Sequence, residues 1–133
     1  LVGSEMCIRD RFLIISNTAE TKQEPTQQGP KLTHAQETWI AALEWCESSG
    51  DPNAINPKDS DGTPSYGSFN FKPSTLDYFA KKYGIATTTV MDTYVQHAVV
   101  EAMVLDQKHV DFSQQFPYCV KRKVGYPPKV MHT

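Results

Sequence analysis

Residues 47–71 read ESSGDPNAINPKDSDGTPSYGSFNF, and the rest of the chain is arranged around this stretch. It begins with Glu47, a carboxylate that closes an apolar helical stripe. A polar segment rich in turn-forming residues follows, and a short aromatic run then ends just before Pro73. Clusters of Gly, Pro, Asn, Asp and Ser between periodic segments are typical of loops. The stretch therefore predicts the end of one helix, a polar loop and the start of a second helix.

The first helix is predicted to start at about Thr33. Thr33 and Gln36 fit the capping-box pattern, in which the Thr hydroxyl and the Gln amide bind backbone N–H groups at the helix start. Gly50 suits the position just past the helix end. Residues at three- and four-residue spacing share one face, and here they are Gln36, Trp39, Ile40, Leu43, Cys46 and Glu47. Glu47 is therefore expected on the buried face of the last turn.

Glu47 is the leading candidate for a chemical role. Partial burial and the negative end of the helix dipole both disfavour its charged form, so both raise its pKa. A carboxyl group that keeps its proton near neutral pH can act as a general acid. The alternative is a terminal Glu that turns outward into solvent and has no chemical role, because a perturbed carboxylate is a candidate and not a proof.

The polar loop carries two further carboxylates. The pair Asp61–Gly62 indicates a tight turn, with a small hairpin as one form of it. Asp59 and Asp61 are candidates for a second carboxylate opposite Glu47, and the alternative is that they bond their own backbone as turn residues. A calcium loop counted from Asp59 would need an acid at its twelfth position, which is Asn70 here.

The remaining helices follow from periodicity. Pro73 fits the first position of a second helix. Asp92 is the predicted N-cap of a third, and residues 94–105 are apolar nearly all round, so Tyr94 and its neighbours are expected in the core. Residues 112–120 mark one or two short helices. The expected fold is mainly α, of the α+β type, with about five helices and a small loop or hairpin region between the first two.

The composition describes one globular domain of 133 residues with 39% hydrophobic residues and a net charge of −2, which gives no case for nucleic-acid binding. Residues 1–11 look like a translated sequencing adaptor. Residues 12–32 read as a truncated leader or flexible linker, and their apolar run is too short to span a membrane. The folded domain is expected over residues 33–128, with a tail at 129–133.

Two cysteines, Cys46 and Cys119, remain once residues 1–11 are set aside. A bridge between them would close a loop of about seventy residues, which is worth on the order of 4 kcal/mol in the chain-entropy model. Two buried thiols in a reducing compartment are the alternative. No histidine has ligand spacing with either cysteine, so no metal is expected, and Cys46 has no histidine nearby in sequence to activate it as a nucleophile.

Two motifs carry a family resemblance. Residues 47–54 (ESSGDPNA), followed by residues 65–71 (SYGSFNF), resemble the lytic transglycosylase domain of the lysozyme-like superfamily. Its hallmarks are a helix-terminal Glu–Ser pair and a later Gly-Leu-Met-Gln-like run, and the resemblance covers roughly residues 36–124. Residues 119–128 also resemble the C-terminal end of small secreted members, where the cysteine pairs with one beside the acid. The resemblance thus implies a Cys46–Cys119 disulfide, as does the export expected of a wall enzyme.

The resemblance also implies roles for individual residues. Glu47 would be the single catalytic acid/base acting on peptidoglycan glycan strands, and Ser48 would help to orient it. No second carboxylate or cofactor is required, because the substrate's own N-acetyl group takes the nucleophile's part. The expected sugar-binding residues are Ser65, Tyr66, Gly67, Phe69 and Asn70. The family's later tyrosine motif is not evident, although Tyr78 and Tyr94 are available.

We therefore expect a secreted or cell-envelope, monomeric, lysozyme-like enzyme whose partner is the glycan strand, with no nucleic acid and no membrane span. One alternative is a hydrolytic muramidase that uses Asp59 or Asp61 as its second carboxylate. Another is a catalytically inactive wall-binding module, because Asn70 stands where the family usually has Gln. A third is a small helical interaction domain with no glycan role.

Overall fold

The computed structural model describes residues 31–57, 59 and 61–129, so the predictions for residues 1–30 and 130–133 lie outside the described residues. The fold is mainly α with one small sheet, as predicted. Its elements in chain order are α1 (His34–Ser48), β2 (Ile55–Asn56), β3 (Ser65–Tyr66), α2 (Pro73–Lys82), α3 (Thr93–Leu105), the 3₁₀ turn η1 (Gln107–His109), α4 (Phe112–Gln115), α5 (Pro117–Cys119) and the π-helical turn η2 (Val120–Val124).

Helix α1 begins and ends where the local signals predict. The Gln36 N–H donates to Thr33 Oγ1 at 3.1 Å, and the Thr33 N–H donates to Gln36 Oε1 at 2.8 Å, which completes the capping box. At the other end Ser49 and Gly50 have positive φ angles of 56° and 78°, and the left-handed backbone stops the helix. Glu47 therefore lies in the last turn, and its side chain is half-buried.

The hairpin follows directly. Strands β2 and β3 pair antiparallel with Ile55 opposite Tyr66 and Asn56 opposite Ser65. Residues 57–64 connect them, with Gly62 at a φ of 84° in the turn that the Asp–Gly pair predicts. Beyond β3 the chain turns back on itself, because the backbones of Tyr66 and Phe71 exchange two hydrogen bonds of 2.9 Å. The hairpin and this turn precede α2.

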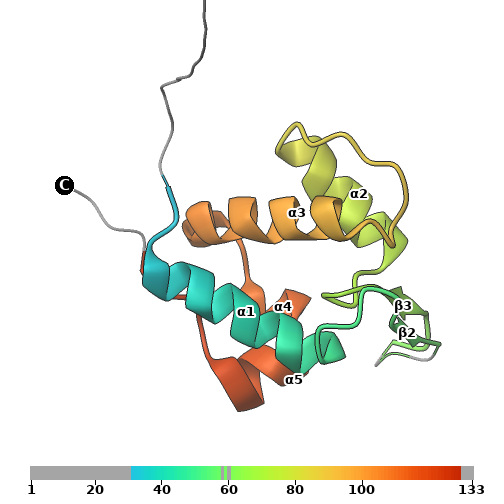
Figure 1. The fold of residues 1–133 in the computed structure, drawn as a ribbon, viewed down its shortest axis with the longest axis horizontal. Coiled ribbons are helices and arrows are strands. Elements are labelled where there is room, and N and C mark those ends of the chain that lie inside the picture. Colours follow the sequence, from blue (N-terminus) through green and yellow to red (C-terminus); the bar gives the residue numbers. More distant parts are fainter. Residues whose placement is uncertain (1–30, 58, 60, 130–133) are drawn as a thin grey trace, which may run out of the picture. The chain divides into compact units, whose positions relative to one another are not determined.

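Helix α1 lies between α3 on one side and α5 with η2 on the other, and the hairpin lies beyond its C-terminal end (Figure 1). Asp92 caps α3 as predicted, with its carboxylate accepting from the Tyr94 and Val95 N–H groups. The core is a single cluster that includes the fully buried side chains of Leu43, Phe69, Val99, Val100, Met103 and Val104. Helix α3 thus supplies much of the core, as its near-continuous apolar sequence predicts.

The expectation that Tyr94 packs in the core is wrong. Its side chain is 89% exposed, and Tyr78 on α2 is also exposed. Tyr94 lies in the first turn of α3, where the side chain still faces solvent, whereas the buried face runs through Val95, Val99 and Met103. A helix with a nearly continuous apolar sequence can still leave one face of its first turn uncovered.

The predicted disulfide between Cys46 and Cys119 is present, with a Cα–Cα distance of 5.9 Å across a sequence separation of 73 residues. It ties the last turn of α1 to α5. Farther along, the Trp39 indole N–H donates to the Gly125 carbonyl at 3.2 Å, so the C-terminal segment follows α1. Within the described part of the chain, no helix is both long and apolar enough to cross a bilayer.

Candidate active site

A groove with a volume of about 470 Å³ lies where the end of α1, the hairpin loop and the α4–α5 segment meet. Glu47 contributes from α1. The hairpin side and the turn before α2 contribute Asp59, Asp61, Ser65, Asn70, Phe71 and Lys72, and α2 contributes Thr75. The α4–α5 side of the groove is formed by Gln114, Gln115, Phe116, Pro117 and Tyr118. The groove therefore brings together Glu47 and both candidate loop carboxylates.

The groove environment keeps the Glu47 carboxyl group protonated near neutral pH. Its pKa is raised from 4.5 to about 8, mainly by burial and then by the negative charge of Asp59, while a hydrogen bond with the Asn70 side chain works in the opposite direction. Burial is the largest of these causes because the charged form loses hydration in the groove. At pH 7 the group is therefore mainly an acid that can give up a proton.

Asn70 makes direct contact with Glu47. Its Nδ2 donates to the main-chain carbonyl of Glu47, and hydrogen bonding from its side chain favours the charged form of the Glu47 carboxyl group and so lowers the pKa. The Asn70 backbone has a φ of 52°, a left-handed conformation that Asn adopts more readily than most residues. Its N–H donates to the Gly67 carbonyl at 3.0 Å, which closes the turn. An amide one methylene shorter than Gln thus still reaches the candidate acid.

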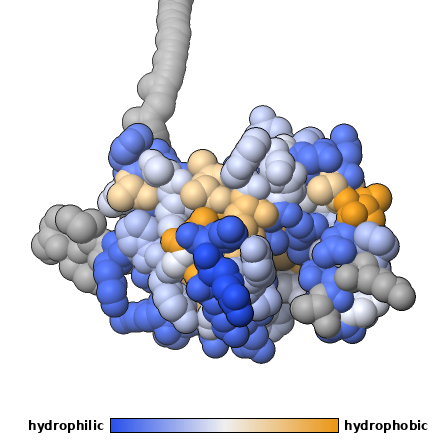
Figure 2. All heavy atoms as spheres, turned by 90° about the horizontal axis from the view of Figure 1, so that it is seen from below, coloured by the Kyte–Doolittle hydropathy of each residue, from blue (hydrophilic) through white to orange (hydrophobic). Residues whose placement is uncertain are grey.

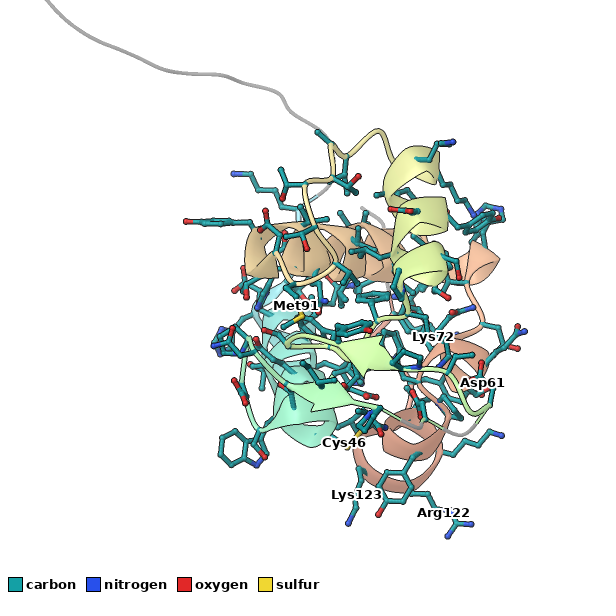
Figure 3. The ribbon with its side chains drawn as sticks, turned by 90° about the vertical axis from the view of Figure 1, so that its right-hand side faces the viewer. Cys46, Asp61, Lys72, Met91, Arg122 and Lys123 are labelled. Carbon is teal, nitrogen blue, oxygen red and sulfur yellow. A yellow bond between two sulfur atoms is a disulfide. The ribbon has the colours of Figure 1, made fainter. Side chains whose placement is uncertain are left out.

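The two loop carboxylates are held by local hydrogen bonds and by one lysine. Ser65 Oγ donates to Asp59 Oδ2 at 2.5 Å, and Asp61 Oδ1 accepts from the Thr63 N–H at 3.0 Å and from Thr63 Oγ1 at 2.7 Å. Figure 3 shows Lys72 and Asp61 side by side on one side of the fold. Hydrogen bonds from Thr63, followed by Lys72, hold the pKa of Asp61 well below its usual range. Asp61 is thus charged at neutral pH.

Sequence reasoning missed Gln96, which organises the turn beside the acid. The Gln96 side chain is fully buried in α3. Its Oε1 accepts from the Phe69 N–H at 2.8 Å, and its Nε2 donates to the carbonyls of Tyr66 at 2.9 Å and Val90 at 2.5 Å. A buried amide that satisfies three backbone groups fixes the path of residues 66–69. Its signal in the sequence is a polar residue within an otherwise apolar helix.

Gly67 explains why this turn can lie so close to α3. Its φ is 82°, and a Cβ at this position would lie 2.4 Å from Gln96 Nε2. Any side chain would therefore push the amide away from the Tyr66 carbonyl. Gly67 is buried and does not line the groove. Its function in the fold is to let Gln96 approach the backbone.

Three other predicted site residues lie away from the groove wall. Ser48 Oγ donates to the Glu44 carbonyl at 3.3 Å, one turn back along α1. The Phe69 side chain is fully buried and packs edge-on against His97, with ring centroids 5.0 Å apart. Tyr66 is half-buried in β3, and its backbone hydrogen-bonds the Gln96 side chain and the backbone of Phe71. Of the predicted sugar-binding residues, Ser65 and Asn70 line the groove.

The opposite wall was not predicted as part of the site. Tyr118 is 61% exposed, and it lines the groove together with Gln114 and Gln115. The adjacent turn η2 carries the exposed cations Lys121, Arg122 and Lys123, two of which are labelled at the lower edge of Figure 3. Figure 2 shows strongly hydrophilic side chains at the centre of the face viewed from below. These residues lie more than forty positions from residues 47–71, so no local pattern connects them.

Within residues 31–57, 59 and 61–129, no group of three or more His, Cys, Asp or Glu side chains is placed to hold a metal ion. Comparison of the chain with protein-family models, curated proteins and solved structures finds no match.

Proposed function

We propose that this protein cleaves the glycan strands of peptidoglycan by a lytic transglycosylase-like mechanism in which Glu47 is the single acid/base. The observation that carries the proposal is the pKa of about 8 for a half-buried glutamic acid at the edge of a groove. A glycosidase acid must be protonated when the substrate binds, and burial is the usual means of achieving this. The resemblance of residues 47–54 and 65–71 to that family supports the same assignment.

The groove has the chemical character of a sugar-binding site. Tyr118 supplies an exposed aromatic ring, and Gln114 and Gln115 supply amide groups beside it. A pyranose ring has apolar faces and a rim of hydroxyl groups, so an aromatic surface with adjacent polar groups suits it. The volume of about 470 Å³ is within the range of ligand pockets.

In the first step Glu47 gives its proton to the glycosidic oxygen, and the bond between that oxygen and C1 breaks. The carbonyl oxygen of the substrate's N-acetyl group bonds to C1, so the substrate supplies the nucleophile. Glu47 is now a carboxylate, with the Asn70 side chain as its hydrogen-bond partner. Asn70 stabilises the charged form because an N–H donor lowers the cost of ionisation.

In the second step the Glu47 carboxylate takes the proton of the 6-hydroxyl group of the same sugar. The hydroxyl oxygen bonds to C1, and the bond between C1 and the N-acetyl oxygen breaks. The new bond closes a 1,6-anhydro ring. Glu47 ends protonated, and no water is consumed. One carboxyl group thus acts first as acid and then as base, as it does in other glycoside-cleaving enzymes.

A hydrolytic muramidase is the second candidate, and one observation favours it. Asp59 lines the same groove as Glu47, and its negative charge acts on the Glu47 carboxyl group. Two carboxyl groups across a glycosidic bond are the usual arrangement in hydrolases. Such an enzyme would add water and leave reducing ends in place of anhydro ends.

A cell-envelope or secreted location is part of the proposal. The Cys46–Cys119 disulfide supports it because such bonds persist in oxidising compartments and are rare in the reducing cytosol. Peptidoglycan lies in those same compartments.

Incubation with purified peptidoglycan sacculi, followed by mass analysis of the soluble products, tests the proposal. Soluble fragments with 1,6-anhydromuramic ends are expected. Fragments with reducing ends would show that the protein is a hydrolase and not a transglycosylase. Binding to sacculi without soluble products would identify a non-catalytic wall-binding module. If the protein neither binds sacculi nor releases products, the proposed glycan role is wrong.

A further inference from the structure

Lys72 is anchored on a rigid part of the fold. It is the N-cap of α2 and follows Phe71, whose side chain is 3% exposed. The Lys72 carbonyl accepts the first helical hydrogen bond from the Leu76 N–H at 2.9 Å. The two hydrogen bonds between Tyr66 and Phe71 fix the chain just before it. The backbone from which the Lys72 side chain extends is therefore well determined.

From this base the side chain reaches back to the hairpin loop. Lys72 Nζ lies 2.9 Å from Asp61 Oδ1 and 3.5 Å from Asp59 Oδ2. It also donates to the Thr63 carbonyl and to Ser65 Oγ, both at 3.3 Å. One ammonium group thus contacts four positions in residues 59–65. Its side chain is 25% exposed, which limits screening of these interactions by water.

The loop lines the same groove as the candidate acid, and the charge of Asp59 acts on Glu47, so the position of the loop matters to Glu47. The charged or titratable residues that line the groove with Glu47 are Asp59, Asp61 and Lys72 from the hairpin side and Tyr118 from α5. Without the ammonium group, Asp59 and Asp61 would lose the cation that bridges their like charges. Their repulsion would move the loop outward and let water reach Glu47.

We propose that Lys72 is a positioning residue that holds the Asp59–Ser65 loop against the groove and so limits the exposure of the Glu47 carboxyl group to water. This role rests on the proposed function of Glu47 as the acid. Lys72 does not touch the reacting atoms in this assignment. It acts through the loop, by keeping Asp59 beside the groove and water away from the Glu47 carboxyl group.

The test is a titration of Glu47 in the full chain without substrate. Side-chain carboxyl carbons of ¹³C-labelled glutamate are followed by NMR across pH, and the Glu47 signal is assigned by its loss in Glu47→Gln. In Lys72→Met the pKa of Glu47 is expected to fall by roughly one pH unit as the loop opens and solvation increases. Lys72→Arg should keep the wild-type titration, because a guanidinium group can bond both carboxylates.

Lys82→Met is the matched control. Lys82 lies at the other end of α2 and also forms an ion pair, 3.6 Å from Asp106 Oδ2. The titration of Glu47 should be unchanged in this variant. If Lys72→Met does not fold, Lys72→Gln, which keeps N–H donors but loses the charge, is read in the same way.

An unchanged titration in the uncharged Lys72 variant would overturn the proposal. A rise in the pKa of Glu47 would also overturn it, since it would show that Lys72 merely neutralises Asp59 while the loop stays in place. The outcome is independent of glycan cleavage. Failure to release fragments from sacculi would contradict the proposed function. An unaltered titration of Glu47 in Lys72→Met would contradict the role of Lys72.

Discussion

Two carboxyl groups that line one groove, Glu47 and Asp61, are driven in opposite directions by their surroundings. Burial, together with the negative charge of Asp59, raises the pKa of Glu47 to about 8, whereas hydrogen bonds from Thr63 hold the pKa of Asp61 below its usual range. Both are ordinary acids by residue type. A groove with one neutral and one charged carboxyl group separates a proton donor from a fixed negative charge. The same functional group is thus protonated at the end of a helix and charged in an exposed loop.

The supports of the two groups differ as well. Glu47 lies next to Cys46, whose disulfide to Cys119 ties the last turn of α1 to α5. Asp61 lies in a loop whose position depends on hydrogen bonds and on the side chain of Lys72. A precise proton transfer requires a rigidly held donor, and covalent and helical support supplies that. A charged loop can tolerate more movement.

The largest expected effect is that of Glu47→Gln on glycan cleavage. An amide cannot deliver a proton to the glycosidic oxygen, so the rate should fall by about 10²–10⁴-fold. The fold should be retained, because Gln is nearly isosteric and a neutral group suits the helix C-terminus. Fragment release from sacculi measures the rate, with Glu37→Gln, an exposed residue in the first turn of α1, as the control. Full activity in Glu47→Gln would show that Glu47 is not the proton donor, so the contrast with Asp61 would have no catalytic meaning.

The next largest effect concerns the support of Glu47. Replacing both Cys46 and Cys119 by Ala should lower the free energy of unfolding by about 4 kcal/mol, since the bridge closes a long loop. Urea unfolding of the two proteins measures the difference. Labelling of the unreduced, unfolded wild-type chain should find neither of these thiols free. A double variant as stable as the wild type would show that packing alone holds the end of α1.

The pH dependence of stability should reveal Glu47 directly. Its folded-state pKa is raised above the unfolded value of 4.5, so the folded protein holds the proton more tightly. This contribution is fully present below pH 4.5 and is lost as pH rises towards about 8. The slope is at most about 1.4 kcal/mol per pH unit. Unfolding of wild type and Glu47→Gln across that range measures it, and parallel curves would contradict burial of Glu47.

Asp61→Asn should have the smallest effect. Its pKa is lowered, so any stability it contributes is present above its ordinary pKa of 3.8 and is lost as pH falls below that value. Between pH 6 and 8 the thermal midpoint should change little, because the group is exposed. Fragment release should decline far less than in Glu47→Gln. A variant as inactive as Glu47→Gln, with reducing-end products from the wild type, would favour the two-carboxylate hydrolase.

Much of the backbone was predictable because its signals are local. The capping box at Thr33 and Gln36, the cap at Asp92 and the first helical position of Pro73 are all read within one helical turn. The prediction for Tyr94 was wrong because exposure depends on what lies opposite a helix face, and the periodicity of the helix does not contain that information. The role of Gln96 was missed for the same reason.

The sequence by itself determined the helices, the hairpin turn, the last-turn position of Glu47 and the pairing candidates for the disulfide, because caps, periodicity and residue counts are properties of short segments. The tertiary structure alone decided that Asn70 reaches Glu47, that Lys72 contacts both loop carboxylates and that Tyr118 lines the same groove. Those contacts join residues far apart in the chain. Only the packing of α1 against α5 and the return of the chain from the hairpin to α2 bring them together at one groove.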